Sequence, residues 1–90
     1  MSEVAVEIRV TGWVQGVGFR WSCQREAERH RVSGWVRNTA EGAVEGVFEG
    51  APEAVERLVA FCGDGPRGAH VDRVEVIDET AEGISGFSIR

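Results

Sequence analysis

Apolar residues occupy every second position between Val4 and Val10, with charged or small residues in between. This alternation predicts a strand over residues 4–11 with one buried face. Two more segments, 32–38 and 43–49, are rich in β-branched and aromatic residues. The four residues that separate them have a turn-forming composition, so the pair is predicted to form a hairpin.

Two other segments have the spacing of amphipathic helices. The first covers about residues 20–30 and places Phe19, Cys23 and Ala27 four positions apart on one face. The second begins at Pro52, because proline fits the first position of a helix, and a glycine-rich stretch ends it. Its apolar face is predicted to consist of Val55, Leu58, Val59 and Cys62.

Residues 71–78 and 87–89 complete the pattern as a further strand and a short final one. The order is then β, α, β, β, α, β with a small extra C-terminal strand. It predicts an α+β, ferredoxin-like fold, with an antiparallel sheet and both helices packed on one face. The chain has 90 residues, of which 42% are hydrophobic, and this size favours a single domain over residues 1–90.

The charge balance narrows the choice of partners. Ten basic and fifteen acidic side chains give a net charge of -5, which disfavours nucleic acid and anionic membranes as partners because both require a basic surface. No apolar run approaches the roughly 18 residues of a membrane span. The N-terminus also lacks the pattern of a signal peptide, so we expect a cytoplasmic protein. Any anion must be bound by a local site.

The segment between the first strand and the first helix suggests such a site. Residues 12–21 contain no Ser, Thr, Asp or Asn that could cap the helix. They also place Arg20 in the first turn, where a cation meets the positive end of the helix dipole. Gly16 and Gly18 allow the backbone N–H groups to surround a ligand. A bound phosphate would therefore compensate for both the missing cap and the unfavourable position of Arg20. The alternative is a simple connection whose Arg20 points to solvent.

Nucleotide binding is disfavoured for the same segment. It lacks the Lys-Ser or Lys-Thr pair of a Walker loop and the third glycine of a dinucleotide fingerprint. The predicted ligand is therefore a phosphate group and not a nucleotide.

Two stretches resemble the signatures of the acylphosphatase family. Residues 12–20 are similar to its glycine-rich signature, and residues 34–38 and 42–45 are similar to its second one. The resemblance covers nearly the whole chain and implies a small ferredoxin-like enzyme that hydrolyses carboxyl-phosphate anhydrides without a metal or other cofactor. It implies that Arg20 binds the phosphate and that Asn38 positions the attacking water. The implied phosphate cradle is the backbone of Gln15, Gly16, Val17, Gly18 and Phe19.

The chemistry of an acyl phosphate suits these few groups. Its leaving group is a carboxylate, a weak base, so no dedicated general acid is needed. Arg20 and the loop would hold the phosphate oxygens while Asn38 aligns a water for in-line attack. A neutral amide does not readily take the water proton, which would pass to the phosphate or to solvent. Spacing alone also allows Asn38 to be a turn residue at the end of a strand.

We therefore expect a monomeric acylphosphatase that converts a small acyl phosphate into a carboxylate and inorganic phosphate. The alternative is a non-catalytic module that binds phosphate or an acyl phosphate, for example beside a larger partner. Both require Arg20, but only the enzyme requires Asn38. The sequence does not identify the physiological acyl group.

Cys23 and Cys62 lie on the apolar faces of the two predicted helices. A disulfide is geometrically conceivable, but two buried free thiols are expected in a cytoplasmic chain. A shared metal site with His30 is excluded, because seven helical residues separate Cys23 from His30 by about 10.5 Å along the axis. Trp13, Trp21 and Trp35 are expected to pack in the core or in loops, with Trp13 the candidate for the substrate entrance.

The chain departs from the family pattern in two places. His30-Arg31 stands where an aliphatic residue and a glycine are common at the end of the first helix, and Gly46 interrupts the third strand where a branched residue is usual. Arg31 must accept a left-handed conformation, or the helix must end differently. We expect this to affect stability and not chemistry.

Overall fold

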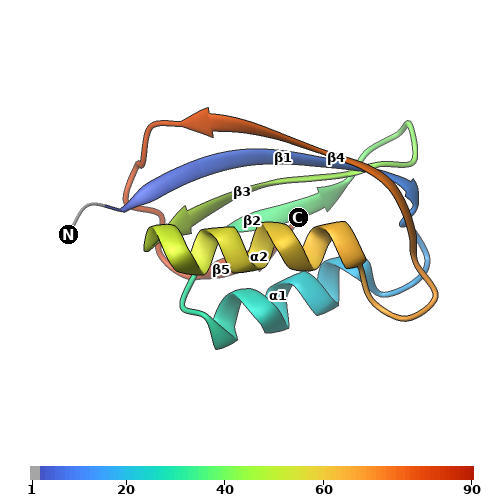
Figure 1. The fold of residues 1–90 in the computed structure, drawn as a ribbon, viewed down its shortest axis with the longest axis horizontal. Coiled ribbons are helices and arrows are strands. Elements are labelled where there is room, and N and C mark those ends of the chain that lie inside the picture. The colour runs from blue at the N-terminus through green and yellow to red at the C-terminus, as the bar shows by residue number, and fades with distance from the viewer. Residues whose placement is uncertain (1–2) are drawn as a thin grey trace.

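The computed structural model describes residues 3–90. Its elements follow the predicted order, and Figure 1 shows their arrangement. They are β1 (Val4–Trp13), α1 (Phe19–Arg29), β2 (Ser33–Asn38), β3 (Val44–Gly50), α2 (Pro52–Asp64), β4 (His70–Glu79) and β5 (Phe87–Ile89).

The strands form one sheet in the order β4-β1-β3-β2-β5. The first four of them pair antiparallel, and both helices lie on the same face of the sheet (Figure 1). This arrangement confirms the predicted ferredoxin-like fold. The short β5 pairs with β2 in parallel, which the sequence pattern did not predict and which makes the sheet mixed. No helix of residues 3–90 is long and apolar enough to cross a membrane.

Strand β1 is two residues longer than predicted. Its pairing with β4 shifts register between Thr11 and Gly12 and then continues to Trp13, which lies opposite His70. The hydrophobic alternation ends before this irregularity, so the extension has no signal of period two. It carries β1 to the edge of the loop that leads into α1.

The hydrophobic core lies between the sheet and the helices. The predicted inward face of α1 is buried throughout, and so is that of α2 apart from Val59, which is only partly buried. Each fully buried aliphatic or aromatic side chain contributes about 1.5–3 kcal/mol to folding. The buried helical residues are Phe19, Cys23, Ala27, Val55, Leu58 and Cys62.

The two cysteines meet at the contact between the helices. Their Sγ atoms lie 3.7 Å apart, beyond the roughly 2.05 Å of a disulfide bond, and both thiols are buried and free. The hydrogen bond with Cys23, together with burial, raises the pKa of the Cys62 thiol. The expectation of two buried free thiols therefore agrees with this structure.

Arg31, the unusual arginine that the sequence singles out, lies two residues after the end of helix α1. Arg31 has φ 59°, the left-handed conformation that glycine adopts more readily. Its N–H donates to the carbonyl of Glu28, and the N–H of Val32 donates to that of Ala27. This pair of bonds is a Schellman motif. The helix thus keeps the usual ending at the cost of backbone strain in Arg31.

The segment between β4 and β5 crosses from one edge of the sheet to the other, and Glu49 of β3 anchors it. The carboxylate of Glu49 is buried and accepts hydrogen bonds from the N–H groups of Glu82, Gly83 and Ile84, at 2.8, 2.6 and 2.9 Å. The bond from Glu82 lowers the pKa of Glu49 most, and burial opposes it only in part. This anchor delivers β5 to its place beside β2.

Replacing Glu49 by glutamine is expected to reduce the sensitivity of the fold to acid. The folded-state pKa of Glu49 lies below its usual value of 4.5, so its contribution to stability is present above pH 4.5 and is lost as the pH falls through the folded value. The wild type should therefore lose free energy of unfolding more steeply below pH 4.5 than the variant. Denaturant unfolding between neutral and acidic pH measures this difference.

Glu56→Gln is the matched control, because Glu56 is exposed on α2 and forms no ion pair within residues 3–90. The control should keep the acid sensitivity of the wild type. Equal slopes for the Glu49 variant and the wild type would contradict the anchoring role.

Candidate functional site

The connection between β1 and α1, residues 14–18, is called the glycine loop below. Gly16 and Gly18 have φ values of 76° and 75°, and a Cβ atom on either would meet nothing within 4 Å. Glycine is therefore favoured here by the backbone conformation and not by lack of space. Gly18 is the N-cap of α1, with no side-chain capping bond and no acidic residue in the first turn. The predicted absence of a cap is confirmed.

The glycine loop and the first turn of α1 present backbone donors without partners. Within residues 3–90, none of the N–H groups of residues 16–21 donates a hydrogen bond to the protein. Unpaired N–H groups at the start of a helix attract anions, and the helix dipole adds to this attraction. The loop therefore has the geometry and the electrostatics of an anion site.

A pocket of about 170 Å³ opens beside this loop and brings the two central candidate residues together. Arg20 comes from the first turn of α1, and Asn38 comes from the last position of β2. The side chain of Arg20 is half-buried and forms no ion pair with any described carboxylate. The pocket is lined by Val14, Gly16, Gly18, Phe19, Arg20, Trp21, Asn38 and Ile89.

Gln15 and Val17 do not line the pocket, although both belong to the predicted cradle. The amide Nε2 of Gln15 donates to the carbonyls of Thr39 and Ala43, at 2.8 and 2.9 Å. It thereby ties the glycine loop to the turn that follows Asn38. Val17 packs against the hydrophobic core. The side chains of Gln15 and Val17 hold the loop in place. Only the backbone of these two residues would take part in binding.

Asn38 has an uncommon environment for a side-chain amide. Its Oδ1 atom is buried and has no hydrogen-bond partner among the described residues, which is a costly arrangement unless a ligand supplies the donor. The alternative role as a turn residue would require Oδ1 to accept a backbone N–H. The structure contains no such bond, so the turn alternative is not supported.

Three lining residues were missed by sequence reasoning as parts of the site. Ile89 reaches the pocket because β5 pairs in parallel with β2 and lies opposite Val36, and no local pattern signals that pairing. Trp21 directly follows Arg20, which is a signal that could have been used. Val14 is a buried residue at the entry to the loop.

The expectation for two tryptophans was wrong. Trp13 is 71% exposed and does not line the pocket, and Trp21 is 57% exposed and does line it. Neither packs in the core, because Trp13 lies at the exposed end of β1 and Trp21 lies on α1 away from its buried face. Trp35 is half-buried on the sheet, with Arg37 and Arg90 against its ring.

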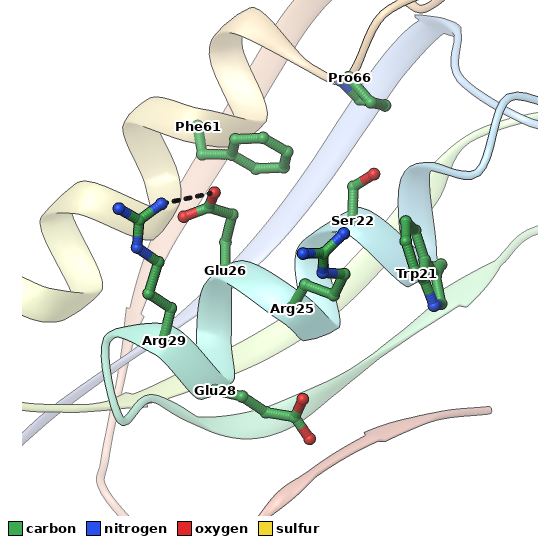
Figure 2. A pocket seen from close by; sticks show the side chains of 8 residues that line it. All are labelled: Trp21, Ser22, Arg25, Glu26, Glu28, Arg29, Phe61 and Pro66. Atoms are coloured by element: carbon green, nitrogen blue, oxygen red, sulfur yellow. Dashed lines mark ion pairs between the residues drawn. The ribbon is translucent and has the colours of Figure 1, made fainter.

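A second, larger depression of about 580 Å³ runs along α1 toward Phe61 and Pro66. Figure 2 shows arginine and glutamate side chains together there, including the ion pair between Arg29 and Glu26. It contains neither Arg20 nor Asn38, and its charges largely neutralise each other. Residues 3–90 also contain no group of three His, Cys, Asp or Glu side chains that could hold a metal ion.

Comparison with known proteins gives consistent matches. The family model described as Acylphosphatase matches residues 6–89. An acylphosphatase of Thermococcus kodakarensis is 52% identical over 89 residues, which are 99% of this chain and 98% of that protein. The crystal structure of the acylphosphatase from Bacillus subtilis superposes with a TM-score of 0.94 and 36% identity, covering 97% of this chain and 98% of that one.

A larger protein contains a similar unit. HypF of T. kodakarensis superposes with a TM-score of 0.83 and 32% identity. The match covers 97% of this chain but 12% of that protein. The same fold therefore also occurs as a small part of a longer chain.

Proposed function

This chain belongs to the acylphosphatase family, and on that premise we propose how its residues carry out the family's reaction. The protein is an acylphosphatase. It hydrolyses the carboxyl-phosphate anhydride of a small acyl phosphate to a carboxylate and inorganic phosphate. The proposal assigns the binding of the phosphate and the attack of water to separate groups.

The phosphate is held by the N–H groups of the glycine loop and by Arg20. The observation that carries this assignment is the run of unpartnered N–H groups at residues 16–21, beside an arginine that has no carboxylate partner in the described chain. During transfer the charge spreads over the equatorial phosphate oxygens, and donors fixed in advance stabilise that charge without reorganising. Arg20 and the loop are therefore expected to act mainly in the transition state.

Asn38 positions the water that attacks phosphorus. Its buried Oδ1 atom has an unused acceptor, and a water that donates to it would lie in the pocket shared with Arg20. The water oxygen forms a bond to phosphorus while the bond from phosphorus to the bridging oxygen breaks. The electron pair of that bond leaves with the carboxylate, and the water proton passes to a phosphate oxygen or to solvent. Asn38 orients the water but does not accept its proton.

The size of the pocket suits a small substrate. Its volume of about 170 Å³ is below the roughly 300–1,000 Å³ of sites for drug-sized ligands. We further propose that the chain works as one domain over residues 1–90, as a cytoplasmic monomer that needs no cofactor. The net charge of -5 supports the absence of nucleic-acid and membrane partners.

A non-catalytic module that binds phosphate or an acyl phosphate is the second candidate. The similarity to a small part of HypF favours it, because a domain of that kind sits beside other parts of a larger protein. Arg20 and the glycine loop do not separate the two candidates, since both candidates bind phosphate, whereas only the enzyme requires Asn38. Turnover does.

Hydrolysis of acetyl phosphate in the presence of a chelator tests the proposed function. We expect the purified chain to release acetate and phosphate at a rate that excess EDTA leaves unchanged, with inorganic phosphate as a competitive inhibitor. Phosphate at millimolar concentration should also raise Tm, because it binds the native state. A rise in Tm without turnover would identify the non-catalytic module, and a rate that EDTA abolishes would contradict the metal-free mechanism.

A further inference from the structure

We propose that Trp21 and Ile89 form an apolar mouth to the catalytic pocket, which selects acyl phosphates with an apolar, preferably flat, acyl group. The inference rests on the proposed function and names a substrate class for the same site. Trp21 and Ile89 are called the apolar mouth below.

Both residues of the apolar mouth are large, hydrophobic and exposed. Trp21 is 57% exposed and Ile89 is 38% exposed, and both line the same pocket. They come from separate elements, α1 and β5. Two exposed hydrophobic side chains at the pocket that contains Arg20 and Asn38 indicate contact with an apolar part of a ligand.

The positions of these residues place the acyl group and not the phosphate between them. Trp21 directly follows Arg20 on α1, and Ile89 lies opposite Val36, two residues before Asn38 on β2. A phosphate held by Arg20 and attacked by water from Asn38 is therefore flanked by the apolar mouth. Because the pocket is small, a ring or branched chain attached to that phosphate must extend to its rim.

The ring of Trp21 is held in position by Arg25. The guanidinium carbon of Arg25 lies 4.7 Å from the centre of the indole ring, within the range of a cation–π contact. Figure 2 shows the two side chains next to each other at the end of the larger depression along α1. A ring that is already ordered loses less entropy when a ligand packs on it.

The test compares benzoyl phosphate with acetyl phosphate in matched variants. For each protein we divide kcat/KM for benzoyl phosphate by kcat/KM for acetyl phosphate. Each variant's ratio is then compared with that of the wild type, so that the different intrinsic reactivities of the two substrates cancel. Trp21→Ala should lower the benzoyl-to-acetyl ratio about tenfold, the low end for an apolar contact in a pocket, because the mouth is open to solvent. Ile89→Ala should lower it less, since an alkyl side chain offers a smaller contact area than an indole.

Two substitutions outside the pocket are the controls. Trp13→Ala removes a tryptophan that is 71% exposed, and Ile77→Ala removes an isoleucine that is 57% exposed on β4. Neither residue lines the pocket, so both variants should keep the wild-type ratio. An unchanged ratio in Trp21→Ala would overturn the inference. If kcat/KM fell equally on both substrates, the ratio would also be unchanged, and Trp21 would be assigned to the phosphate site or to the fold.

Binding of unreactive analogues separates this inference from the proposed function. In phenacylphosphonate and acetonylphosphonate a methylene group replaces the bridging oxygen, so neither is hydrolysed. Displacement of inorganic phosphate by each analogue gives their relative affinities. The aromatic analogue should bind more tightly to the wild type and lose that advantage in Trp21→Ala. Absence of turnover would refute the proposed function alone, whereas equal affinity of both analogues for the wild type would refute the apolar mouth.

Discussion

Replacing Arg20 by glutamine should lower kcat/KM for acetyl phosphate by roughly a thousandfold, the low end for loss of an arginine that stabilises phosphoryl transfer. Glutamine keeps some hydrogen-bonding capacity but removes the charge and the fork of donors. Phosphate binding should weaken as well, because Arg20 is proposed to contact the same oxygens in substrate and product. Steady-state kinetics and titration with inorganic phosphate measure the two losses.

Arg29→Gln is the control for Arg20. Arg29 is an exposed arginine on the same helix, outside the pocket, and among residues 3–90 its one ion pair is with Glu26. An exposed pair of this kind contributes little to stability. This variant should keep the wild-type kinetics. Full activity in Arg20→Gln would refute the assigned role, as would an equal loss in both variants.

Replacing Asn38 by alanine should lower kcat by about a hundredfold to a thousandfold while leaving phosphate affinity unchanged. The expected loss is that of one well-placed amide in a transition state. Phosphate binding survives because the donors of the glycine loop and Arg20 remain. The contrast with Arg20→Gln, which should lose both properties, is measured by the same kinetics and titration.

The thermal stability of the Asn38 variant distinguishes a role in catalysis from a role in folding. Among the described residues, Oδ1 of Asn38 has no hydrogen-bond partner. Replacement by alanine therefore breaks no such bond, and the variant should have a Tm close to that of the wild type. A lower Tm together with weaker phosphate binding would show that Asn38 supports the structure of the pocket.

Local patterns were sufficient to predict most of the fold. The alternation from Val4 to Val10 and the helical spacing of Phe19, Cys23 and Ala27 reflect contacts with the core, which act at each position. The parallel pairing of β5 with β2 could not be read in this way. It depends on a segment that crosses the ends of the strands and on the bonds from Glu49 that hold it.

The residues of the candidate site also differ in whether a local sequence pattern could reveal them. Gly16, Gly18 and Arg20 break local rules of helix capping, and such conflicts are visible in a sequence. Asn38 stood out through resemblance to a family, because an asparagine at the end of a strand is also an ordinary turn residue. Ile89 reaches the pocket through long-range pairing alone. The residues proposed to bind the phosphate were thus easier to predict than those proposed to contact the acyl group.

The overall charge and the local site now fit together. A net charge of -5 disfavours extended polyanions, while the glycine loop concentrates N–H groups and one arginine at a single point. Attraction at that short range is strong because the donors are fixed and partly removed from water. This combination supports the proposal that the chain binds one small phosphate without a basic surface.

Hydrolysis in ¹⁸O-labelled water tests most directly whether water attacks the phosphate that the loop and Arg20 are proposed to hold. The enzyme is allowed to consume acetyl phosphate in labelled water, and mass spectrometry then locates the label in the two products. In-line attack at phosphorus predicts that the label enters inorganic phosphate and that acetate carries none. Label in the acetate would mean attack at the carbonyl carbon, and it would contradict the roles assigned to the glycine loop, Arg20 and Asn38.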